Sequence, residues 1–159
     1  MSNILWMDND RTYLMPFITR LQFAGHSVVQ AYTIGEAEHY LKDPKEKLTA
    51  GNLWDLIIID IMMSVKGAGI SDERYSAEIT GKGRRAGLVF FTNNREAIAN
   101  SGAAVAFLTM RDDEEVKTEA AALGVPAENL MYKMDVADTR EFLQWVEKVL
   151  PRRGKNGEK

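Results

Sequence analysis

The sequence predicts an α/β protein in which a doubly wound, five-stranded parallel sheet is covered by five helices, as in flavodoxin-like folds. Five short apolar runs alternate along the chain with segments of helical character. The strongest run, Leu-Ile-Ile-Ile at 56–59, is unbroken and rich in β-branched residues, which is typical of a strand covered on both faces. Alternation of strands with helices favours a parallel sheet, because parallel neighbours need crossover connections.

In the first half of the chain, the strands and helices are set by apolar runs and their spacing. Apolar residues recur at helical spacing over 14–21, and Gly25 closes this helix. Pro16 fits such a helix if it lies in the first turn. A second helix is expected at 34–42. We expect strands at 4–7, 26–32 and 56–59.

The second half begins with a segment that has no regular period. Residues 64–85 contain several glycines and mixed charges, so we expect a long surface loop inserted here. Asp112 and Asp113 are candidate caps for a later helix. We expect the remaining elements as a helix at 87–100, a strand at 103–108, a helix at 114–123, a strand at 130–132 and a helix at 136–150.

Size, charge and cysteine content limit the classes of function. The 159 residues are 45% hydrophobic and 27% charged, as expected for one globular domain over 1–150 with a polar tail at 151–159, so a multi-domain enzyme is excluded. The 20 basic residues are outnumbered by 23 acidic ones and form no long block, so we expect no nucleic-acid partner. The absence of cysteine excludes a disulfide scaffold and a thiolate zinc site. With neither a signal peptide nor a membrane span recognisable, we expect a cytoplasmic protein.

Polar side chains gather at the predicted strand ends. Asp8 and Asp10 follow the first strand, Asp60 follows the third, and Thr109 and Lys133 end the fourth and fifth. In such sheets ligands bind at the carboxyl ends of the strands. Clustered carboxylates need a divalent cation, and hard oxygen ligands favour Mg²⁺. With a hydroxyl and an ammonium opposite, this set predicts phosphoryl transfer onto a carboxylate.

The same residues, with the stretches LIIIDIMM, VAFLTMRDDEE, AALGV and LMYK, resemble the receiver domain of two-component response regulators over nearly the whole chain. The resemblance implies that Asp60 is the phospho-acceptor, that the Thr109 hydroxyl follows the phosphoryl group and that Lys133 is its ion-pair partner. It further implies a stand-alone receiver in a phosphorelay, which takes phosphoryl from a histidine kinase or phosphotransfer protein and then binds a downstream protein. Such a protein phosphorylates itself and is not a turnover enzyme.

The resemblance also implies a Mg²⁺ site. Its ligands would be Asp8, Asn9, Asp60 and the backbone carbonyl of Met62, with Asp10 as a further candidate. Asn9 occupies the position of the family's second acid, and a neutral amide is a weaker ligand for Mg²⁺ than a carboxylate.

Two further positions depart from the family. Leu130 stands at its aromatic switch position, and Met134 stands where a cis proline usually follows the lysine. The family's usual partner surface corresponds to residues 114–123, 130–132 and 136–150, and the loop at 62–85 is a second candidate.

Two alternative functions remain open from the residues. A pseudo-receiver that acts without phosphorylation is favoured by Asn9, Leu130 and Met134. A phosphatase resembling the haloacid dehalogenase family is suggested by LWMDNDRT, which fits that family's D-x-D-x-T opening and would make Asp8 the nucleophile. This last reading gives Asp60 no role.

Overall fold

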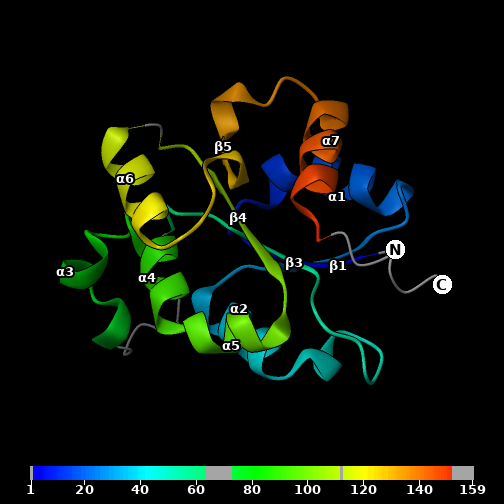
Figure 1. Cartoon of the computed structure of the whole chain (residues 1–159), viewed down its shortest axis with the longest axis horizontal. Coiled ribbons are helices and arrows are strands. Elements are labelled where there is room, and N and C mark those ends of the chain that lie inside the picture. The colour runs from blue at the N-terminus through cyan, green and yellow to red at the C-terminus, as the bar shows by residue number, and fades with distance from the viewer. Residues whose placement is uncertain (1, 64–72, 112, 152–159) are drawn as a thin grey trace.

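A five-stranded parallel sheet forms the centre of the molecule (Figure 1). The computed structural model describes residues 2–63, 73–111 and 113–151. The strands lie in the order β2-β1-β3-β4-β5. This confirms the predicted doubly wound, flavodoxin-like α/β fold. The strands are β1 (Asn3–Met7), β2 (Ser27–Ala31), β3 (Leu56–Ile59), β4 (Ala104–Thr109) and β5 (Leu130–Tyr132).

Seven α-helices accompany the sheet within the described ranges, where five were expected. They are α1 (Arg11–Phe23), α2 (Ile34–Lys42), α3 (Ala77–Thr80), α4 (Ala86–Asn93), α5 (Arg95–Ser101), α6 (Glu114–Ala122) and α7 (Thr139–Val149). Short 3₁₀ helices are η1 (Pro44–Glu46), η2 (Glu73–Tyr75), η3 (Ala127–Asn129) and η4 (Lys133–Asp135). The difference in number arises between residues 73 and 101.

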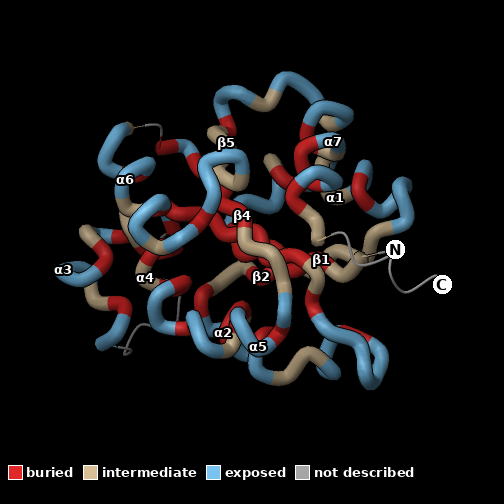
Figure 2. The backbone as a smooth tube through the Cα atoms, viewed as in Figure 1, coloured by how far each residue is buried: buried red, intermediate tan, exposed pale blue. Residues whose placement is uncertain are grey.

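Alternate residues of the central strands enter two separate cores. The buried colour covers β3 and most of β1, and on β4 it covers the part toward the end of the strand (Figure 2). Leu5 and Ile57 belong to the core shared with α2, α4, α5 and α6. Trp6 and Ile58 belong to the core shared with α1 and α7. Because both faces are covered, polar side chains are confined to the positions where strands end. This arrangement sets the place of the functional site.

Helix α1 contains its proline deeper than expected. Asp10 caps the helix, so Pro16 is the sixth helical residue and not part of the first turn. The ring removes the hydrogen bond to the Thr12 carbonyl, but both residues lie on the exposed side, where water is available. Burial of Leu14 and Leu21 on the other side holds the helix on the sheet.

The helix predicted at 87–100 is two helices, α4 and α5, separated at Asn94. Asn94 is buried, and its side-chain amide donates to the Phe90 carbonyl and to Glu38 Oε2, both at 2.9 Å, and to the Tyr75 hydroxyl at 3.2 Å. An asparagine that bonds backbone and distant groups competes with the helical ladder. These long-range partners explain why periodicity alone predicted one helix.

Residues 73–85 do not form the irregular loop that was expected. They contain η2 and α3, and Tyr75 is only 5% exposed. Glu38 of α2 accepts from the Tyr75 hydroxyl and from the Arg74 guanidinium, each at 2.8 Å. The segment is therefore packed on α2 and α4 through a buried carboxylate. The other residues of the expected loop, 64–72, lie outside the described ranges.

The last helix begins later than expected. The chain forms η4 directly after β5, and Asp138 caps α7 by accepting from the Glu141 N–H at 2.8 Å. The predicted apolar stripe is confirmed, since Phe142 and Trp145 lie in the core.

Over the described residues, none of the helices combines the length and apolar character that crossing a bilayer requires.

Candidate functional site

Four polar side chains lie at one edge of the sheet, where the parallel strands end. Asp8 follows β1, Asp60 follows β3, Thr109 is the last residue of β4 and Lys133 follows β5. All four residues are buried, with exposed fractions between 0% for Asp8 and Thr109 and 9% for Lys133. Burying charged groups is unfavourable unless partners compensate them, so their contacts define the site.

The ammonium of Lys133 connects two carboxylates. Lys133 Nζ lies 2.8 Å from Asp8 Oδ2 and 3.4 Å from Asp60 Oδ2. The structure thus brings together three of the predicted site residues from the ends of three strands. Two carboxylates share one cation, so the cluster has a net negative charge when both acids are ionised.

Backbone groups fix the position of Asp8. Its N–H donates to the Ala31 carbonyl at 3.0 Å, and its own carbonyl accepts from the Gln30 side-chain amide at 2.8 Å. Asp8 Oδ1 accepts from the Asp10 N–H at 2.9 Å, which leaves Oδ2 toward Lys133. The first acid is therefore held as part of the link between β1 and β2.

Asp60 is held from the strand side and from α4. Its N–H donates to the Met7 carbonyl at 3.0 Å, and its Oδ1 accepts from the Met62 N–H at 3.2 Å. Gly87 of α4 donates to the Ile61 carbonyl at 2.9 Å. A β-carbon at Gly87 would lie 2.2 Å from the Asp60 carbonyl oxygen, so only glycine permits this approach. No pattern in the sequence marks Gly87 as part of the site.

Burial and charge shift the titration of the cluster. Burial, followed by the charge of Asp8, raises the pKa of Asp60 to about 7, against the opposing effect of Lys133. Burial alone would lower the pKa of Lys133, but the Asp60 and Asp8 carboxylates outweigh it and raise that pKa. One negative charge in the cluster therefore lacks a compensating cation, and the site favours an additional proton or cation.

Tyr13 of α1 is a neighbour that the sequence analysis missed. Its hydroxyl donates to the Lys133 carbonyl at 3.3 Å, and the Lys133 ammonium lies 5.2 Å from the ring centroid. Burial raises the pKa of this phenol. Its position three residues after the cap of α1 was the available signal, because the first turn of that helix begins at the strand-end edge.

At the end of β4, Thr109 and Arg111 form a separate hydrogen-bonded unit. Thr109 Oγ1 accepts from the Arg111 N–H at 3.1 Å. The buried guanidinium of Arg111 donates to both carboxylate oxygens of Asp113 and to the Arg84 carbonyl, each at 3.0 Å. Arg111 therefore connects the loop after β4 to the residue before the cap of α4.

The other proposed metal ligands lie differently. Asn9 and Asp10 are exposed, and Asp10 Oδ1 caps α1 by accepting from the Tyr13 N–H at 2.8 Å. The Met62 N–H is bonded to Asp60. In the part of the chain that the structure describes, no three His, Cys, Asp or Glu side chains are grouped to hold a metal ion.

The sequence and the structure give different results when each is compared with known proteins. No protein-family model matches the sequence, and no curated protein is significantly similar to it. The structure, in contrast, is similar to a receiver domain of a Francisella response regulator, with 19% identity, a TM-score of 0.63, and coverage of 94% of this chain and 96% of that one. It is also similar to a response regulator from Thermotoga maritima, with 17% identity, a TM-score of 0.64, and coverage of 94% of this chain and 97% of that one. For the chemotaxis protein CheY4 of Vibrio cholerae, the identity is 21%, the TM-score is 0.63, and the match covers 94% of this chain and 99% of that one. The chain therefore has the fold of response regulator receiver domains.

Proposed function

We propose that this chain is a phosphorelay receiver in which Asp60 accepts a phosphoryl group from a histidine kinase or a phosphotransfer protein. The observation that carries the proposal is the buried Asp60 carboxylate, 3.4 Å from the Lys133 ammonium, beside the Asp8 carboxylate that Lys133 also contacts. The receiver fold supports the proposal, because the three groups lie at the carboxyl ends of its strands.

The chemistry follows from the roles that these groups can take. An Asp60 oxygen attacks the phosphorus, the bond from phosphorus to the donor's nitrogen or oxygen breaks, and the product is an acyl phosphate. Lys133 neutralises charge on the phosphoryl oxygens, and the Thr109 hydroxyl is a hydrogen-bond donor at the end of the adjacent strand. The Asp60 carboxylate must be ionised to attack, and the charge of Asp8 contributes to raising its pKa. A cation that neutralises Asp8 therefore increases the fraction of Asp60 that is ionised and able to react.

The donor set fits Mg²⁺. Asp8 and Asp60 provide hard carboxylate oxygens, and the cluster has one negative charge that Lys133 does not compensate. We infer that these two acids and the Met62 carbonyl bind the ion. Asn9 and Asp10, which are exposed, are further candidate ligands. When bound, Mg²⁺ neutralises charge on the transferred phosphoryl group.

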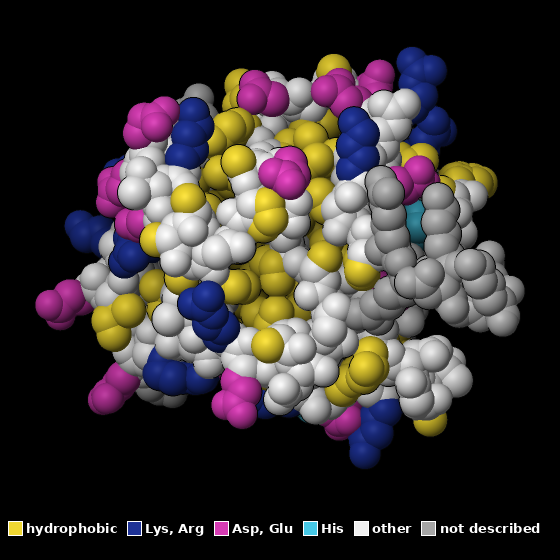
Figure 3. Space-filling model, in the orientation of Figure 1, with side chains coloured by type: hydrophobic (Ala, Val, Ile, Leu, Met, Phe, Trp, Pro, Cys, Tyr) yellow, Lys and Arg dark blue, Asp and Glu magenta, His cyan; other side chains and the backbone are white. Residues whose placement is uncertain are grey.

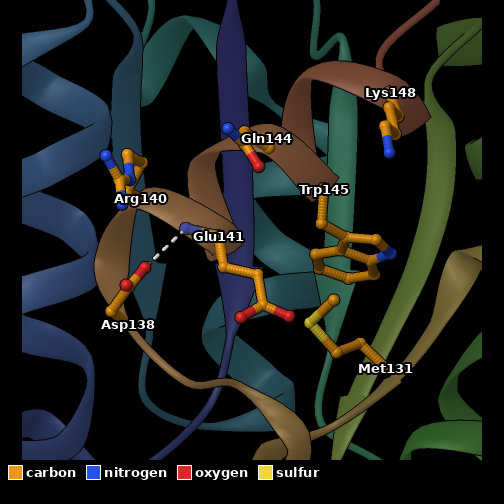
Figure 4. A pocket seen from close by; sticks show the side chains of 7 residues that line it. All are labelled: Met131, Asp138, Arg140, Glu141, Gln144, Trp145 and Lys148. Atoms are coloured by element: carbon orange, nitrogen blue, oxygen red, sulfur yellow. Dashed lines mark hydrogen bonds between the residues drawn. The ribbon is translucent and has the colours of Figure 1, made fainter.

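A partner surface on α6, β5 and α7 is consistent with this function. Hydrophobic side chains gather over the middle of the face in Figure 3, between α6 and α7, and charged side chains lie mainly around it. A cavity of about 540 Å³ lies where Met131 of β5 meets α7, and Arg140, Glu141 and Lys148 provide charges of both signs around it (Figure 4). The downstream partner would dock on this mixed surface.

The proposal is tested by intact-mass measurement after incubation with Mg²⁺ and acetyl phosphate. The wild-type chain should gain one phosphoryl group, and Asp60→Asn should gain none. Asp43→Asn, which changes an acid remote from the site, should behave as wild type. Asp8→Asn should reduce the adduct, because it removes a carboxylate that we assign to the metal site.

Other outcomes select the alternative functions. Absence of any adduct would contradict the proposal and favour the pseudo-receiver. Turnover of a phosphoester that depends on Asp8 and not on Asp60 would also contradict it, and would favour the phosphatase.

A further inference from the structure

A surface groove separates two helices on the side of the molecule opposite to α7 (Figure 1). We call it the α4–α6 groove, and its cavity volume is about 380 Å³. Its apolar lining comes from Leu88 and Val89 of α4, from Ala122 and Leu123 at the end of α6, and from Ile79 of α3. Ile79 is 47% exposed, although it is a large hydrophobic residue. The groove therefore offers apolar area that the described residues leave uncovered.

A basic turn borders this groove. Residues 80–84 join Ile79 to Arg85, and Ile79 and Arg85 both line the cavity. Lys82 and Arg84 are exposed and form no ion pair within the described residues, whereas Arg85 is paired with Glu119 at 3.0 Å. Among the described residues, the rim of the groove therefore has two exposed cations outside any ion pair, although the charge of Arg84 also helps to lower the pKa of Asp113.

The conformation of this turn is strained and firmly held. Lys82 has a φ of 59°, the one positive value among the described residues other than glycine. Its N–H donates to the Ala77 carbonyl at 2.7 Å, and the buried Thr80 accepts from the Gly83 N–H at 3.1 Å and from the Arg85 N–H at 2.8 Å. Strained residues persist where surrounding bonds over-determine them, and they concentrate at functional positions.

Arg111 ties together the two walls of the groove. Its guanidinium donates to the Arg84 carbonyl, one residue before the cap of α4, and to Asp113, the cap of α6. The guanidinium is 6% exposed, whereas its acceptor Asp113 is 42% exposed, so water reaches the carboxylate side of this pair. Arg111, whose own N–H is bonded to Thr109, thus joins the N-terminal ends of α4 and α6, and the Arg85–Glu119 ion pair is a second link between the same walls.

We propose that the α4–α6 groove is a docking site for an amphipathic, acidic segment of a partner protein, and that Arg111 links this site to Asp60. An apolar side chain of the partner enters the groove beside Ile79 and Leu123, and the partner's carboxylates meet Lys82 and Arg84. The groove is preformed, so the unmodified chain binds the segment.

The link to Asp60 rests on the proposed function. If Asp60 carries a phosphoryl group and the Thr109 side chain rotates about χ1 to donate to it, Oγ1 moves away from the Arg111 N–H, which loses its acceptor. The bonds of Arg111 to Arg84 and Asp113 then loosen, and the walls of the groove lose their fixed spacing. Phosphorylation therefore weakens binding of the segment.

A peptide selection tests the groove without knowledge of the partner. The probe is a displayed library of random peptides of about twelve residues, just over three helical turns, selected against the unmodified chain. The enriched peptides should combine apolar residues with Asp or Glu. Their affinity should fall about tenfold in Ala122→Trp, which fills the groove from an exposed position. Failure of any peptide to be enriched, or equal binding to Ala122→Trp, would overturn the docking site.

Matched variants separate the groove from its surroundings. Ala121→Trp adds the same side chain at the neighbouring exposed position, which does not line the cavity, and should bind as wild type. Reversing the rim charges with Lys82→Glu and Arg84→Glu should abolish binding. The same reversal at Arg20 and Lys42, on α1 and α2, should leave it unchanged.

The coupling has its own readout. After treatment with acetyl phosphate and Mg²⁺, a sample shown by intact mass to carry one phosphoryl group should bind the peptide at least about fivefold more weakly. In Arg111→Met the two states should bind alike. A formed adduct with unchanged wild-type affinity overturns the coupling alone. Absence of the adduct overturns the proposed function and with it the coupling, while the groove is still judged on the unmodified chain.

Discussion

The strand-end edge of the sheet has two regions that are built in opposite ways. At the ends of β1, β3 and β5, Asp8 and Asp60 share the single ammonium of Lys133, and burial leaves a charge uncompensated. At the end of β4, the guanidinium of Arg111 is fully engaged with neighbouring carbonyl and carboxylate oxygens. The first region favours an additional proton or cation, and the second joins the N-terminal ends of α4 and α6. Buried charge alone therefore does not identify a reactive site. What distinguishes the two regions is whether neighbouring groups compensate the buried charge.

Removing the shared ammonium should have the largest effect. Lys133→Met leaves two buried carboxylates without a cation, and we expect a loss of about 3–5 kcal/mol in the free energy of unfolding at pH 8. Urea unfolding measures this loss. Adding Asp8→Asn should recover part of it, because one charge is then removed.

An exposed lysine provides the control for this change. Lys117→Met removes a partner of Glu114 in a surface pair, and should alter stability by less than about 0.5 kcal/mol. Equal losses for the two lysine variants would contradict a charge-balanced cluster.

Crowding the backbone of Asp60 should have the next largest effect. Gly87→Ala brings a methyl group against the Asp60 carbonyl and the Ile61 backbone, so we expect a loss of about 2–3 kcal/mol. Gly35→Ala in α2 is the matched control, since its nearest atom is 3.8 Å away, and it should be neutral or slightly stabilising. Thermal unfolding of both variants checks the prediction, and a neutral Gly87→Ala would disprove the close approach.

The pH dependence of stability distinguishes the unbalanced region. The pKa of Asp60 is raised from 3.8 to about 7 in the folded chain, so the folded state binds more protons than the unfolded state between these values. Stability from this group is fully present below pH 3.8 and is lost as pH rises through about 7. In the presence of a chelator, which removes divalent cations, Asp60→Asn should abolish this decline in stability. At pH 8 the variant should be more stable than the wild type by on the order of 1–3 kcal/mol.

The control for the pH experiment is an acid outside the cluster. Asp43→Asn changes an acid in a surface pair with Lys45 at 3.9 Å and should keep the wild-type decline. Urea unfolding at several pH values provides the data. A wild-type decline that persists in Asp60→Asn would show that Asp60 is not its source.

The smallest effect is expected at the edge of the cluster. Tyr13→Phe removes a hydroxyl that donates to the Lys133 carbonyl at 3.3 Å, and should lower stability by about 0.5 kcal/mol without changing the adduct at Asp60. Chemical unfolding and intact mass measure the two quantities. A loss as large as that of Gly87→Ala would mean that Tyr13 supports the cluster more strongly than its geometry indicates.

Local patterns were sufficient for the strands and for their ends. Leu56–Ile59 and Leu130–Tyr132 are found where apolar runs predicted them, because both depend on short contiguous stretches. Asp8, Asp60 and Lys133 meet because a parallel sheet aligns its strand ends. Their mutual contact therefore follows from the fold class, whereas their titration depends on burial that no spacing reveals.

Non-local partners account for most of what the sequence did not predict. The break at Asn94 and the folding of residues 73–85 both depend on Glu38, which lies far away along the chain. The role of Arg111 likewise depends on the Arg84 carbonyl. Backbone acceptors and single buried acids have no signature in hydrophobic periodicity.

The central claim is tested most directly by locating the modified residue. The chain is treated with acetyl phosphate and Mg²⁺, the acyl phosphate is reduced with borohydride, and the peptides are mapped by mass spectrometry. Our account predicts that Asp60 alone is converted to homoserine. Conversion at Asp8, or at no aspartate, would contradict it.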